Sequence, residues 1–520
     1  MKRFTAMLLI VLSLMMLLTS CGSTPANSGD GGNSGSGTAS TTGNTRPTTN
    51  SKAENSLVYP IGSIPTTLDP EHFALQTEDM IINQVYETLW RQKLNGEIVN
   101  FLAEEWTLNE DGSVSITLRD AKFHSGDTLK SEDVEYTVGR LATSTLSADI
   151  YGYFSVEVED DTHLKLLFPY AEQGAGFNEL LPYLVNVRIE NKSWAETQIA
   201  DVNDTLPLAE DGTGAYVFSN LSDGGDVTLT RFEDYWGDAT LDSVKLKYLT
   251  GSADIAFESG DIDMASYVAS AVGQVKDLEN VTVEEVSSTS VTFLILGCNE
   301  NLVTSDLKVR QAIAYALNRE DLASAASDGS GKVAYNIAPP TVEYYTEDVE
   351  KFERNVEKSK ELMAEAGYSD SNRAHITLIT LGAQTMWVSA CELAKANLEE
   401  SYFTVDIEQQ DSSARYFQGD YEMGIINFSY TTSFPMYNVL FNLESGIDLA
   451  WYDGSGNILD TFSAITDEAT AQKAMREAVE TIAYYPLFYP TVFYAKDSDL
   501  DLGPDFGEME TFFKDLSWKD

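Results

Sequence analysis

From residue 54 onward, the chain alternates between strand-like and helix-like patterns of hydrophobic and polar residues. Apolar and polar residues alternate with a period of two, as in a half-buried strand, at residues 113–118, 162–168, 226–231 and 243–248. Residues 109–112 (NEDG), just before the first of these segments, have the composition of a hairpin turn. The pattern therefore predicts several strands in the first half of the chain.

Helices are predicted mainly in the second half. Apolar residues between positions 309 and 317 fall on one face of a helix that Asp306 is placed to cap. Asn355 is placed to cap a helix that ends at Gly367. This helix is expected to cover residues 356–366. Further helices are expected to start near Ser131, with the Ser131 side chain as cap, and to cover residues 389–398 and 468–482.

The order of these elements predicts the fold class. Strands and helices are mixed without a strict βαβ rhythm, which favours an α/β protein with more than one lobe. No proline-rich linker divides the body, so the lobes are expected to share crossover strands.

The N-terminus has the pattern of a secretion signal. Lys2 and Arg3 precede an apolar run over residues 4–18 that is too short for a membrane span. The run ends in LTSC at residues 18–21, which resembles the lipobox of bacterial lipoproteins. That resemblance implies cleavage of a signal peptide over residues 1–20 and lipidation at Cys21.

Residues 21–53 are expected to form a flexible, lipid-anchored tether. Of residues 22–52, 24 of 31 are Gly, Ser, Thr or Asn, and such a segment buries too little apolar surface to offset its ordering entropy. A random coil of this length reaches roughly 30 Å. The expected location is therefore extracytoplasmic, with the protein anchored to the cell membrane.

Composition and charge narrow the possible partners. The chain has 520 residues, and 33 Lys+Arg against 82 Asp+Glu give a formal net charge of −49. Such a charge argues against nucleic acid as partner and against electrostatic docking on anionic lipid. With 43% hydrophobic residues, the chain has material for two or three globular domains.

The motifs of common exported enzymes are absent from the sequence. It contains no G-x-S-x-G elbow, no H-E-x-x-H helix, no C-x-x-C pair and no P-loop, and its four histidines are isolated. We therefore expect no catalytic residue, cofactor or metal. Carboxylate pairs within residues 104–105 and 157–161 leave a surface-anchored hydrolase such as a glycosidase as the alternative, although a solvated acidic surface explains them better.

Beyond Cys21, only Cys298 and Cys391 remain, which is no disulfide framework. Buried, unpaired thiols are the preferred interpretation, and a bridge between Cys298 and Cys391 is the alternative.

Several sequence blocks have distinctive layouts. The most distinctive stretch is residues 99–119 (VNFLAEEWTLNEDGSVSITLR), followed by AKFHSGD at 121–127 and KSEDV at 130–134. The other blocks are LDP at 68–70, VYETLW at 85–90, GTGAY at 212–216, DYWG at 234–237, GDID at 260–263, DLKVRQAIAYALNR at 306–319, KSKELMAEAGY at 358–368 and PLFYP at 486–490. In this order the blocks resemble the motifs of family 5 extracellular solute-binding proteins, the oligopeptide-, dipeptide- and nickel-binding components of ABC importers.

The resemblance implies a two-lobed periplasmic-binding-protein-like fold with crossover strands and an additional small subdomain. Lobe I would comprise residues 54–95, 206–297 and 489–520, the subdomain residues 96–205, and lobe II residues 298–488. The protein would capture a peptide or sugar oligomer between the lobes and deliver it to the permease and ATPase subunits of an ABC importer.

One loop departs from the family pattern. The peptide binders carry G-x-F-D-x-x-R-x-G-W-x-x-D, and the corresponding residues 419–431 place Ile425, Phe428 and Thr431 at its Arg, Trp and final Asp. A neutral hydroxyl cannot supply the charge-assisted hydrogen bond, worth about 1.5–3 kcal/mol, that holds a peptide's amino terminus. The resemblance therefore does not predict peptide binding through that anchor.

The ligand contacts expected by resemblance come from four regions, with the region around Tyr489 and Phe493 as a weaker candidate. Aromatic rings in the loop after residue 427 suit sugar faces or apolar side chains. The expected ligand-binding residues are Thr77 and Glu78 before the first helix, Asn299 after a strand, Trp387 in a loop, and Phe428, Tyr430, Thr431, Phe434 and Tyr437.

Overall fold

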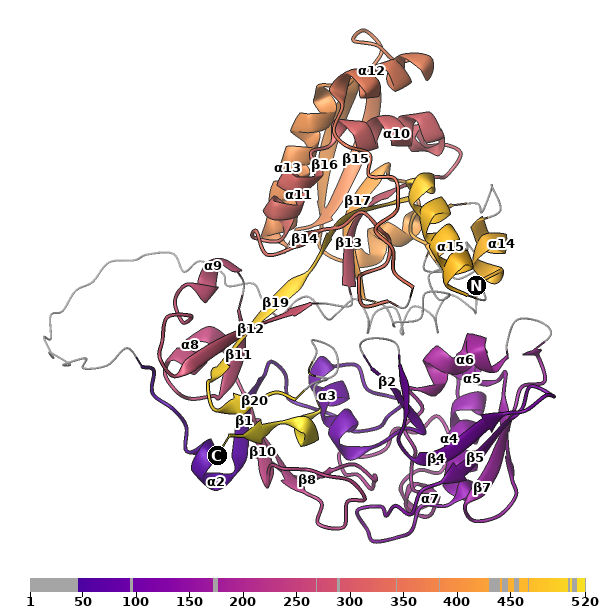
Figure 1. The fold of residues 1–520 in the computed structure, drawn as a ribbon, viewed down its shortest axis with the longest axis vertical. Helices are drawn as coiled ribbons and strands as arrows, with labels where there is room; N and C mark the ends of the chain where they lie inside the picture. Colours follow the sequence, from indigo (N-terminus) through magenta and orange to yellow (C-terminus); the bar gives the residue numbers. More distant parts are fainter. Residues whose placement is uncertain are drawn as a thin grey trace, which may run out of the picture.

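The structure is a computed structural model of the whole chain. It describes residues 45–519 except for residues 94–96, 172–175, 268, 288–289, 343, 383, 430–439, 442–447, 453–457, 466, 504–505 and 507–511. Within the described residues, no helix has both the length and the apolar character needed to cross a bilayer. The described chain forms two bodies, a lower body (residues 45–287 and 491–519) and an upper body (residues 290–489), arranged as in Figure 1.

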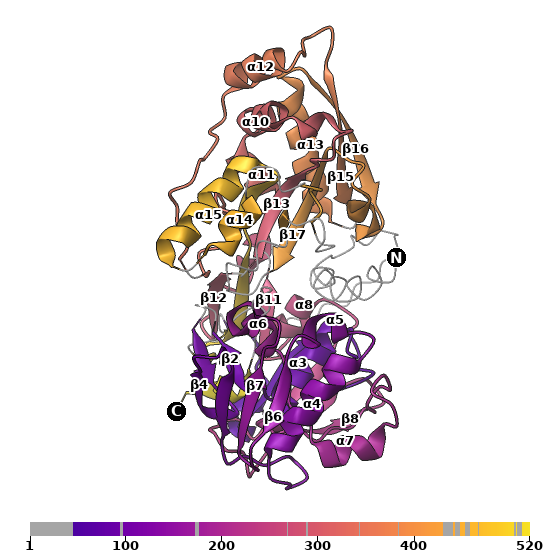
Figure 2. The same cartoon turned by 90° about the vertical axis from the view of Figure 1, so that its right-hand side faces the viewer.

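The lower body contains a mixed sheet with strand order β1-β10-β9-β8. Its strands are β1 (Ser56–Ile61), β10 (Ser243–Tyr248), β9 (Val227–Arg231) and β8 (Tyr216–Leu221). Helix α3 (Gln76–Val85) turns Ile81, Ile82 and Val85 into the same core as these strands. In Figures 1 and 2, α3 lies in the half of the lower body that faces the upper body.

A second sheet of the lower body has its own core. Its order is β4-β5-β7-β6, and all neighbours are antiparallel. Val114, Ile116 and Leu118 of β5 alternate with half-buried polar residues, and the buried face packs with Val134 and Val138 of α4 (Ser131–Thr143). The four strands are β4 (Ala103–Leu108), β5 (Val114–Leu118), β7 (His163–Leu167) and β6 (Ser155–Val158).

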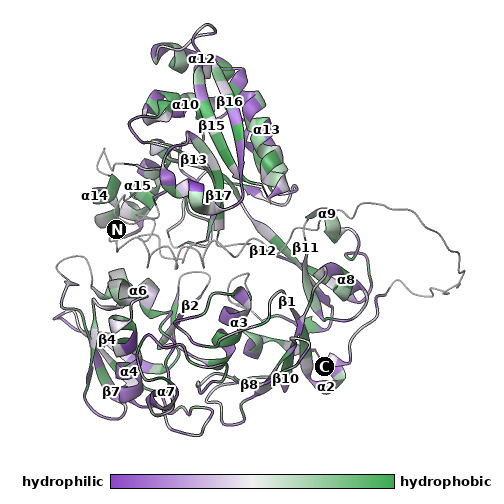
Figure 3. Cartoon of the chain, turned by 180° about the vertical axis from the view of Figure 1, so that it is seen from behind, coloured by the Kyte–Doolittle hydropathy of each residue, from purple (hydrophilic) through white to green (hydrophobic). Residues whose placement is uncertain are grey.

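The upper body is built on one six-stranded sheet with order β14-β18-β13-β17-β15-β16. All seven residues of β13 are buried, as expected for a strand covered by helices on both faces. Figure 3 shows green, hydrophobic stretches along β15 and more mixed colours along β16, the strand at the edge of the sheet. The strands are β14 (Lys332–Val333), β18 (Tyr484–Tyr489), β13 (Ser290–Leu296), β17 (Met423–Ser429), β15 (Ala374–Leu381) and β16 (Phe403–Gln410).

Among the described residues, six α-helices contribute apolar residues to the core of the upper body. They are α10 (Leu307–Ala316), α11 (Arg319–Ala326), α12 (Val356–Glu365), α13 (Thr385–Glu399), α14 (Ile458–Ser463) and α15 (Glu468–Thr481).

The elements predicted from periodicity are confirmed with small shifts. The four predicted strands appear as β5, β7, β9 and β10. Asp306 caps α10 by accepting a hydrogen bond from the Lys308 amide, and Asn355 caps α12 in the same way. The predicted helices over 389–398 and 468–482 appear as α13, which begins four residues earlier, and α15. The predicted α/β class with more than one lobe is also confirmed.

The predicted cap of α4 is wrong. Ser131 is the first helical residue rather than the N-cap, and its hydroxyl makes no hydrogen bond. The residue before it, Lys130, occupies the cap position, and its amide donates to the Asp133 carboxylate over 2.8 Å. A carboxylate in the first turn therefore replaces the expected serine cap.

The segment expected to end the flexible tether is packed against the lower body. The Arg46 guanidinium is buried beneath the body surface, stacks on the Phe257 ring at 3.8 Å and donates to the Phe257 and Ile262 carbonyls. Helix α2 (Ser51–Glu54) follows directly. The contacts of this segment with the lower body thus begin at Arg46.

Candidate ligand-binding site

Two strand pairs carry the chain between the bodies. In the lower body, β19 (Thr491–Asp497) pairs with β12 (Val281–Ser287), so that Ser287 lies opposite Thr491. In the upper body the same two chain segments continue as β18 and β13, with Thr292 opposite Phe488. The bodies are therefore joined by a ribbon of two crossing segments. A narrow connection of this kind permits hinge motion, and ligands commonly bind between the bodies so joined.

Proline marks one of the two crossings. Pro490 stands between Tyr489, the last residue of β18, and Thr491, the first residue of β19. Because proline has no amide hydrogen to donate to a ladder, it suits a position where a strand leaves one sheet for another.

One end of the upper sheet is the end at which the chain crosses to the lower body. β13 begins there at Ser290, and β17 ends there, because Ser290 pairs with Ser429 in an antiparallel register. β15 runs parallel to β17, so its carboxyl end and the following start of α13 lie at the same end of the sheet. The side chains available to a solute between the bodies are thus those at the carboxyl ends of β15 and β17.

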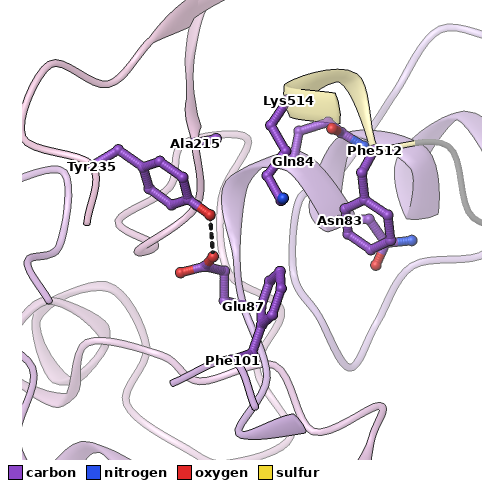
Figure 4. Close-up of a pocket in the computed structure, with 9 residues that line it drawn as sticks. Asn83, Gln84, Glu87, Phe101, Ala215, Tyr235, Phe512 and Lys514 are labelled. Carbon is purple, nitrogen blue, oxygen red and sulfur yellow. Dashed lines mark hydrogen bonds between the residues drawn. The ribbon is translucent and has the colours of Figure 1, made fainter. Parts of the chain in front are cut away.

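A small pocket lies within the lower body and not between the bodies (Figure 4). It has an empty volume of about 200 Å³, part of which is open solvent. The residues that line it are Asn83, Gln84, Glu87, Phe101, Gly214, Ala215, Tyr235, Phe512 and Lys514.

The carboxylate of this pocket, that of Glu87, already has hydrogen-bond partners within the protein. The Glu87 carboxylate accepts hydrogen bonds from the Tyr235 hydroxyl at 2.8 Å, the Trp236 indole at 2.8 Å and the Thr213 hydroxyl at 3.0 Å. Burial raises the pKa of Glu87 to about 7 despite these bonds. Since ligand pockets usually measure about 300–1,000 Å³, this space is small, and we interpret Glu87 as a link between three chain segments.

Comparison with known proteins identifies the family. The profile of "Bacterial extracellular solute-binding proteins, family 5 Middle" matches residues 97–447. The chain belongs to this family. The resemblance predicted from the ordered motifs is therefore confirmed, and members of family 5 are solute-binding proteins rather than enzymes.

Two similar proteins support the assignment to this family. The oligopeptide-binding protein AppA of Bacillus subtilis is 25% identical over 87% of this chain and 91% of its own length. The dipeptide-binding protein of Escherichia coli is 24% identical over 60% of this chain and 63% of its own length.

Two solved structures share the fold. The ABC transporter substrate-binding protein CtaP of Listeria monocytogenes has a TM-score of 0.77 at 20% identity, over 89% of this chain and 99% of that chain. AppA of Bacillus subtilis in complex with a nonapeptide has a TM-score of 0.70 at 22% identity, again over 89% and 99%. The predicted two-lobed family fold is thus confirmed.

The predicted contacts of the lower body lie in the first turn of α3 and not in a loop. The Thr77 hydroxyl accepts a hydrogen bond from Ser63 at 2.9 Å. The buried Glu78 carboxylate accepts bonds from the amides of Ala74 and Leu75, both at 3.0 Å, and from the amide and hydroxyl of Thr66, both at 2.7 Å. Burial alone would raise the pKa of Glu78, but these bonds lower it below its ordinary value. Glu78 therefore holds the loop that precedes α3.

Two predicted contacts of the upper body come to the same end of the sheet. Phe428 is the second-last residue of β17, and Trp387 lies in the first turn of α13 rather than in a loop. Both side chains belong to the upper core, with exposed fractions of 8% and 7%. The Phe428 ring lies 6.1 Å from Phe293 and 6.2 Å from Tyr484, so most of it packs against neighbouring strands.

Asn299 is not brought next to these two residues. It follows β13 at the end opposite Ser290, where its amide group lies 3.5 Å from the Gly419 carbonyl. Six residues of extended strand separate the two ends, which corresponds to about 20 Å. Asn299 therefore lies at the far end of the upper sheet from Phe428.

Some of the remaining predicted residues lie within the described part of the chain and others lie outside it. Tyr489 is buried, and its hydroxyl accepts a hydrogen bond from the Asn336 amide at 3.3 Å, whereas Phe493 is half-buried on β19. Cys298 and Cys391 are both thiols, and burial raises the pKa of Cys391 to about 12. Outside the described residues lie Cys21, Tyr430, Thr431, Phe434 and Tyr437.

The carboxylate pairs considered for a hydrolase lie on the surface. Glu104, Glu105 and residues 157 and 159–161 are exposed carboxylates, as expected for a solvated acidic surface. No group of three or more metal-ligating side chains occurs among the residues that the structure describes.

One buried polar cluster was not predicted from the sequence. Arg140 on α4 is surrounded by Asp69, Glu71 and Glu190. The signal in the sequence is a charged residue, Arg140, on the buried face of α4. Its partners could not be found in the same way, because they lie at least 50 residues away in the sequence.

Proposed function

We propose that this protein captures an oligopeptide-like or oligosaccharide-like solute between its upper and lower bodies and delivers it to an ABC permease. The supporting observation is the family match over residues 97–447, together with the two-segment ribbon that joins the bodies. The names of the relatives, an oligopeptide-binding and a dipeptide-binding protein, favour a peptide as the first cargo to test.

We infer that the moving parts divide at the ribbon. The strand pairing supports a division between Ser287 and Ser290 and a second division at Pro490. β13 then belongs with lobe II, which would begin at residue 290 instead of residue 298. Closing the bodies over a solute would exclude water from it and so strengthen its hydrogen bonds.

The candidate contacts are the side chains near the crossing end of the upper sheet and the start of α3. We propose Trp387 and Phe428 from the upper body and Thr77 and Glu78 from the lower body, with Tyr430, Thr431, Phe434 and Tyr437 from the segment that follows β17. Asn299 is the least supported, because it lies at the far end of the sheet.

We also propose that Cys21 carries a lipid that holds the protein at the cell membrane. The support is the LTSC sequence at residues 18–21 and the Gly/Ser/Thr/Asn-rich segment that follows it. Replacement of Cys21 by serine is expected to move the protein from the membrane fraction to the soluble fraction, and mass spectrometry of the N-terminal peptide would identify the lipid. Recovery of unmodified Cys21 from membranes would contradict the anchor.

The cargo is tested by thermal unfolding in the presence of defined peptides of two to nine residues and of defined oligosaccharides. A ligand at one hundred times its Kd stabilises the folded state by about 2.7 kcal/mol. At about 2–4 °C per kcal/mol, this corresponds to a rise in Tm of about 5–11 °C.

A shift with either class, confirmed by calorimetry with a stoichiometry near one and by recovery of unaltered ligand, supports solute capture. Hydrolysis of the ligand during the incubation would contradict it. Absence of a shift across both classes would refute this choice of cargo. Delivery is tested separately by measuring uptake of the bound solute in cells with and without the gene.

A further inference from the structure

An ion pair links the two bodies beside the ribbon. The Lys332 ammonium of β14, in the upper body, lies 2.9 Å from a carboxylate oxygen of Glu285 on β12, in the lower body. The two side chains are 59% and 48% exposed. The pair is thus accessible to solvent and salt but spans the connection about which the bodies would move.

The backbone that carries Lys332 is held tightly against the upper sheet. Lys332 pairs with Tyr489, the last residue of β18. At the preceding Gly331, an added Cβ atom would come within 2.4 Å of the Phe488 ring, so only glycine fits there. The Gly331 amide also donates to the Ser327 hydroxyl over 2.8 Å. Lys332 therefore moves with the upper body.

Glu285 is held equally firmly by the lower body. β12 pairs with β19 along its full length, from Val281 opposite Asp497 to Ser287 opposite Thr491, and Glu285 lies opposite Phe493. Its neighbour Glu284 makes an ion pair with Lys496 at 3.0 Å within the lower body. Glu285 consequently moves with the lower body.

Between these two anchors, the chain leaves the upper sheet at Pro490 and enters the lower one at Thr491. A rotation of one body against the other about this ribbon changes the separation of the Lys332 and Glu285 charges. The attraction between opposite charges falls as their separation grows, so the pair favours the arrangement in which it is formed.

We propose that Lys332 and Glu285 are positioning residues that form a strut across the hinge and shift the balance between arrangements of the two bodies. Exposed pairs of this kind contribute little energy each, which corresponds to a change of about two- to fivefold in the ratio of arrangements. Because the pair is exposed, added salt weakens it. An effect on solute affinity rests on the proposed function, whereas an effect on the arrangement of the bodies does not.

The test measures distances between the bodies in the solute-free mature chain. Spin labels are attached at Ile255 on α8 (Ala253–Glu258) and Leu307 on α10, and in a second sample at Leu108 on β4 and Leu307, all of which are exposed. The distance distributions are then compared for the unchanged chain, Glu285→Gln, Lys332→Gln and the double variant, at 50 mM and 500 mM NaCl.

Both single variants are expected to shift the distributions in the same direction, by about two- to fivefold in the population ratio, and the double variant by no more than either. High salt should reproduce the shift in the unchanged chain and add little in the double variant. The matched control is Glu365→Gln, because Glu365 pairs with Lys308 at the same 2.9 Å and similar exposure but within the upper body.

The strut is refuted if Glu285→Gln changes the distributions no more than Glu365→Gln, or if the salt effect persists undiminished in the double variant. Both results are independent of any ligand. If the distances shift as expected but no peptide or oligosaccharide binds, the proposed cargo fails while the strut stands.

Discussion

Removal of the Arg140 side chain is expected to cost more stability than removal of any exposed arginine. The Arg140 guanidinium is only 2% exposed, and it lies 2.7 Å from Asp69 and 3.6 Å from Glu71 and makes a further ion pair with Glu190. Asp69 and Glu71 belong to the loop before α3, and Glu190 directly follows Ile189, which packs in the core of the β4-β5-β7-β6 sheet. The arginine therefore joins the loop that leads to Glu78 with the part of the lower body that is built on that sheet.

The expected loss of stability follows from the carboxylates that remain without a counter-charge. In Arg140→Gln, buried carboxylates lose their counter-charge, and breaking such a buried pair costs about 3–5 kcal/mol. At about 2–4 °C per kcal/mol, Tm should fall by about 6–20 °C. Arg231→Gln is the matched control, since Arg231 pairs with Asp242 at 2.8 Å but is 31% exposed, and its loss should cost less than about 1 kcal/mol.

The cost should also depend on pH in a defined direction. Burial raises the pKa of Glu190 to about 7, although Arg140 acts to lower it. Without Arg140 this pKa rises further, so the folded variant holds a proton that the unfolded chain releases above its ordinary pKa of about 4.5. The loss of stability is therefore smallest at acid pH and grows as the pH rises.

Urea unfolding followed by circular dichroism at pH 5.5 and pH 8 measures both effects. The reasoning is refuted if Arg140→Gln lies within about 1 kcal/mol of Arg231→Gln, or if the difference between variant and unchanged chain is the same at both pH values.

Other substitutions and conditions give three further expected outcomes. Burial raises the pKa of Glu87 and of Asp448 to about 7, so these groups take up protons on folding, and Tm should fall as the pH rises from about 5 to 8; a rising Tm would contradict this. Glu78→Gln should lower the free energy of unfolding in urea by about 1.5–3 kcal/mol, because one charged acceptor serves several donors. The loss should be smaller below pH 4, because the pKa of Glu78 is lowered in the folded state and the carboxylate becomes protonated as the pH approaches that pKa. An unchanged midpoint would count against the role of Glu78 in holding the loop. Gly331→Ala should cost about 1–3 kcal/mol, because its Cβ atom would lie 2.4 Å from the Phe488 ring, whereas Gly251→Ala, with open space around it, should cost less.

Local patterns predicted the elements well because each depends on residues close in the sequence. The alternation in residues 113–118 became β5, and Asp306 and Asn355 cap the helices expected of them. Ser131 misled because it is itself the first helical residue, so that Lys130 takes the cap position and its amide donates to the Asp133 carboxylate. The start of α13 was missed because Gln384, at its cap position, makes no side-chain capping bond that would mark the boundary.

Site residues were harder to predict because burial and register are set by tertiary pairing. Glu78 has the charge of a ligand contact, yet its oxygens accept bonds from the loop that precedes it. Asn299 follows the same strand whose other end faces the crossing, and only the antiparallel register of β13 with β17 shows which end it occupies. Residue type alone does not distinguish these outcomes.

Crossover strands were expected from the sequence, but the residues at which each strand leaves one sheet for the other were harder to predict for a related reason. All residues of β13 and β18 are buried, but no local pattern shows that each strand continues into a second sheet. That fact rests on pairings such as Ser287 with Thr491, which join segments about 200 residues apart. A search for binding chemistry also passes over Lys332 and Glu285, because an exposed lysine and glutamate 47 positions apart carry no ligand motif. If affinity depends on how the two bodies approach each other, as we propose, residues that never touch the solute also affect its binding, and strand register is the observation that locates them.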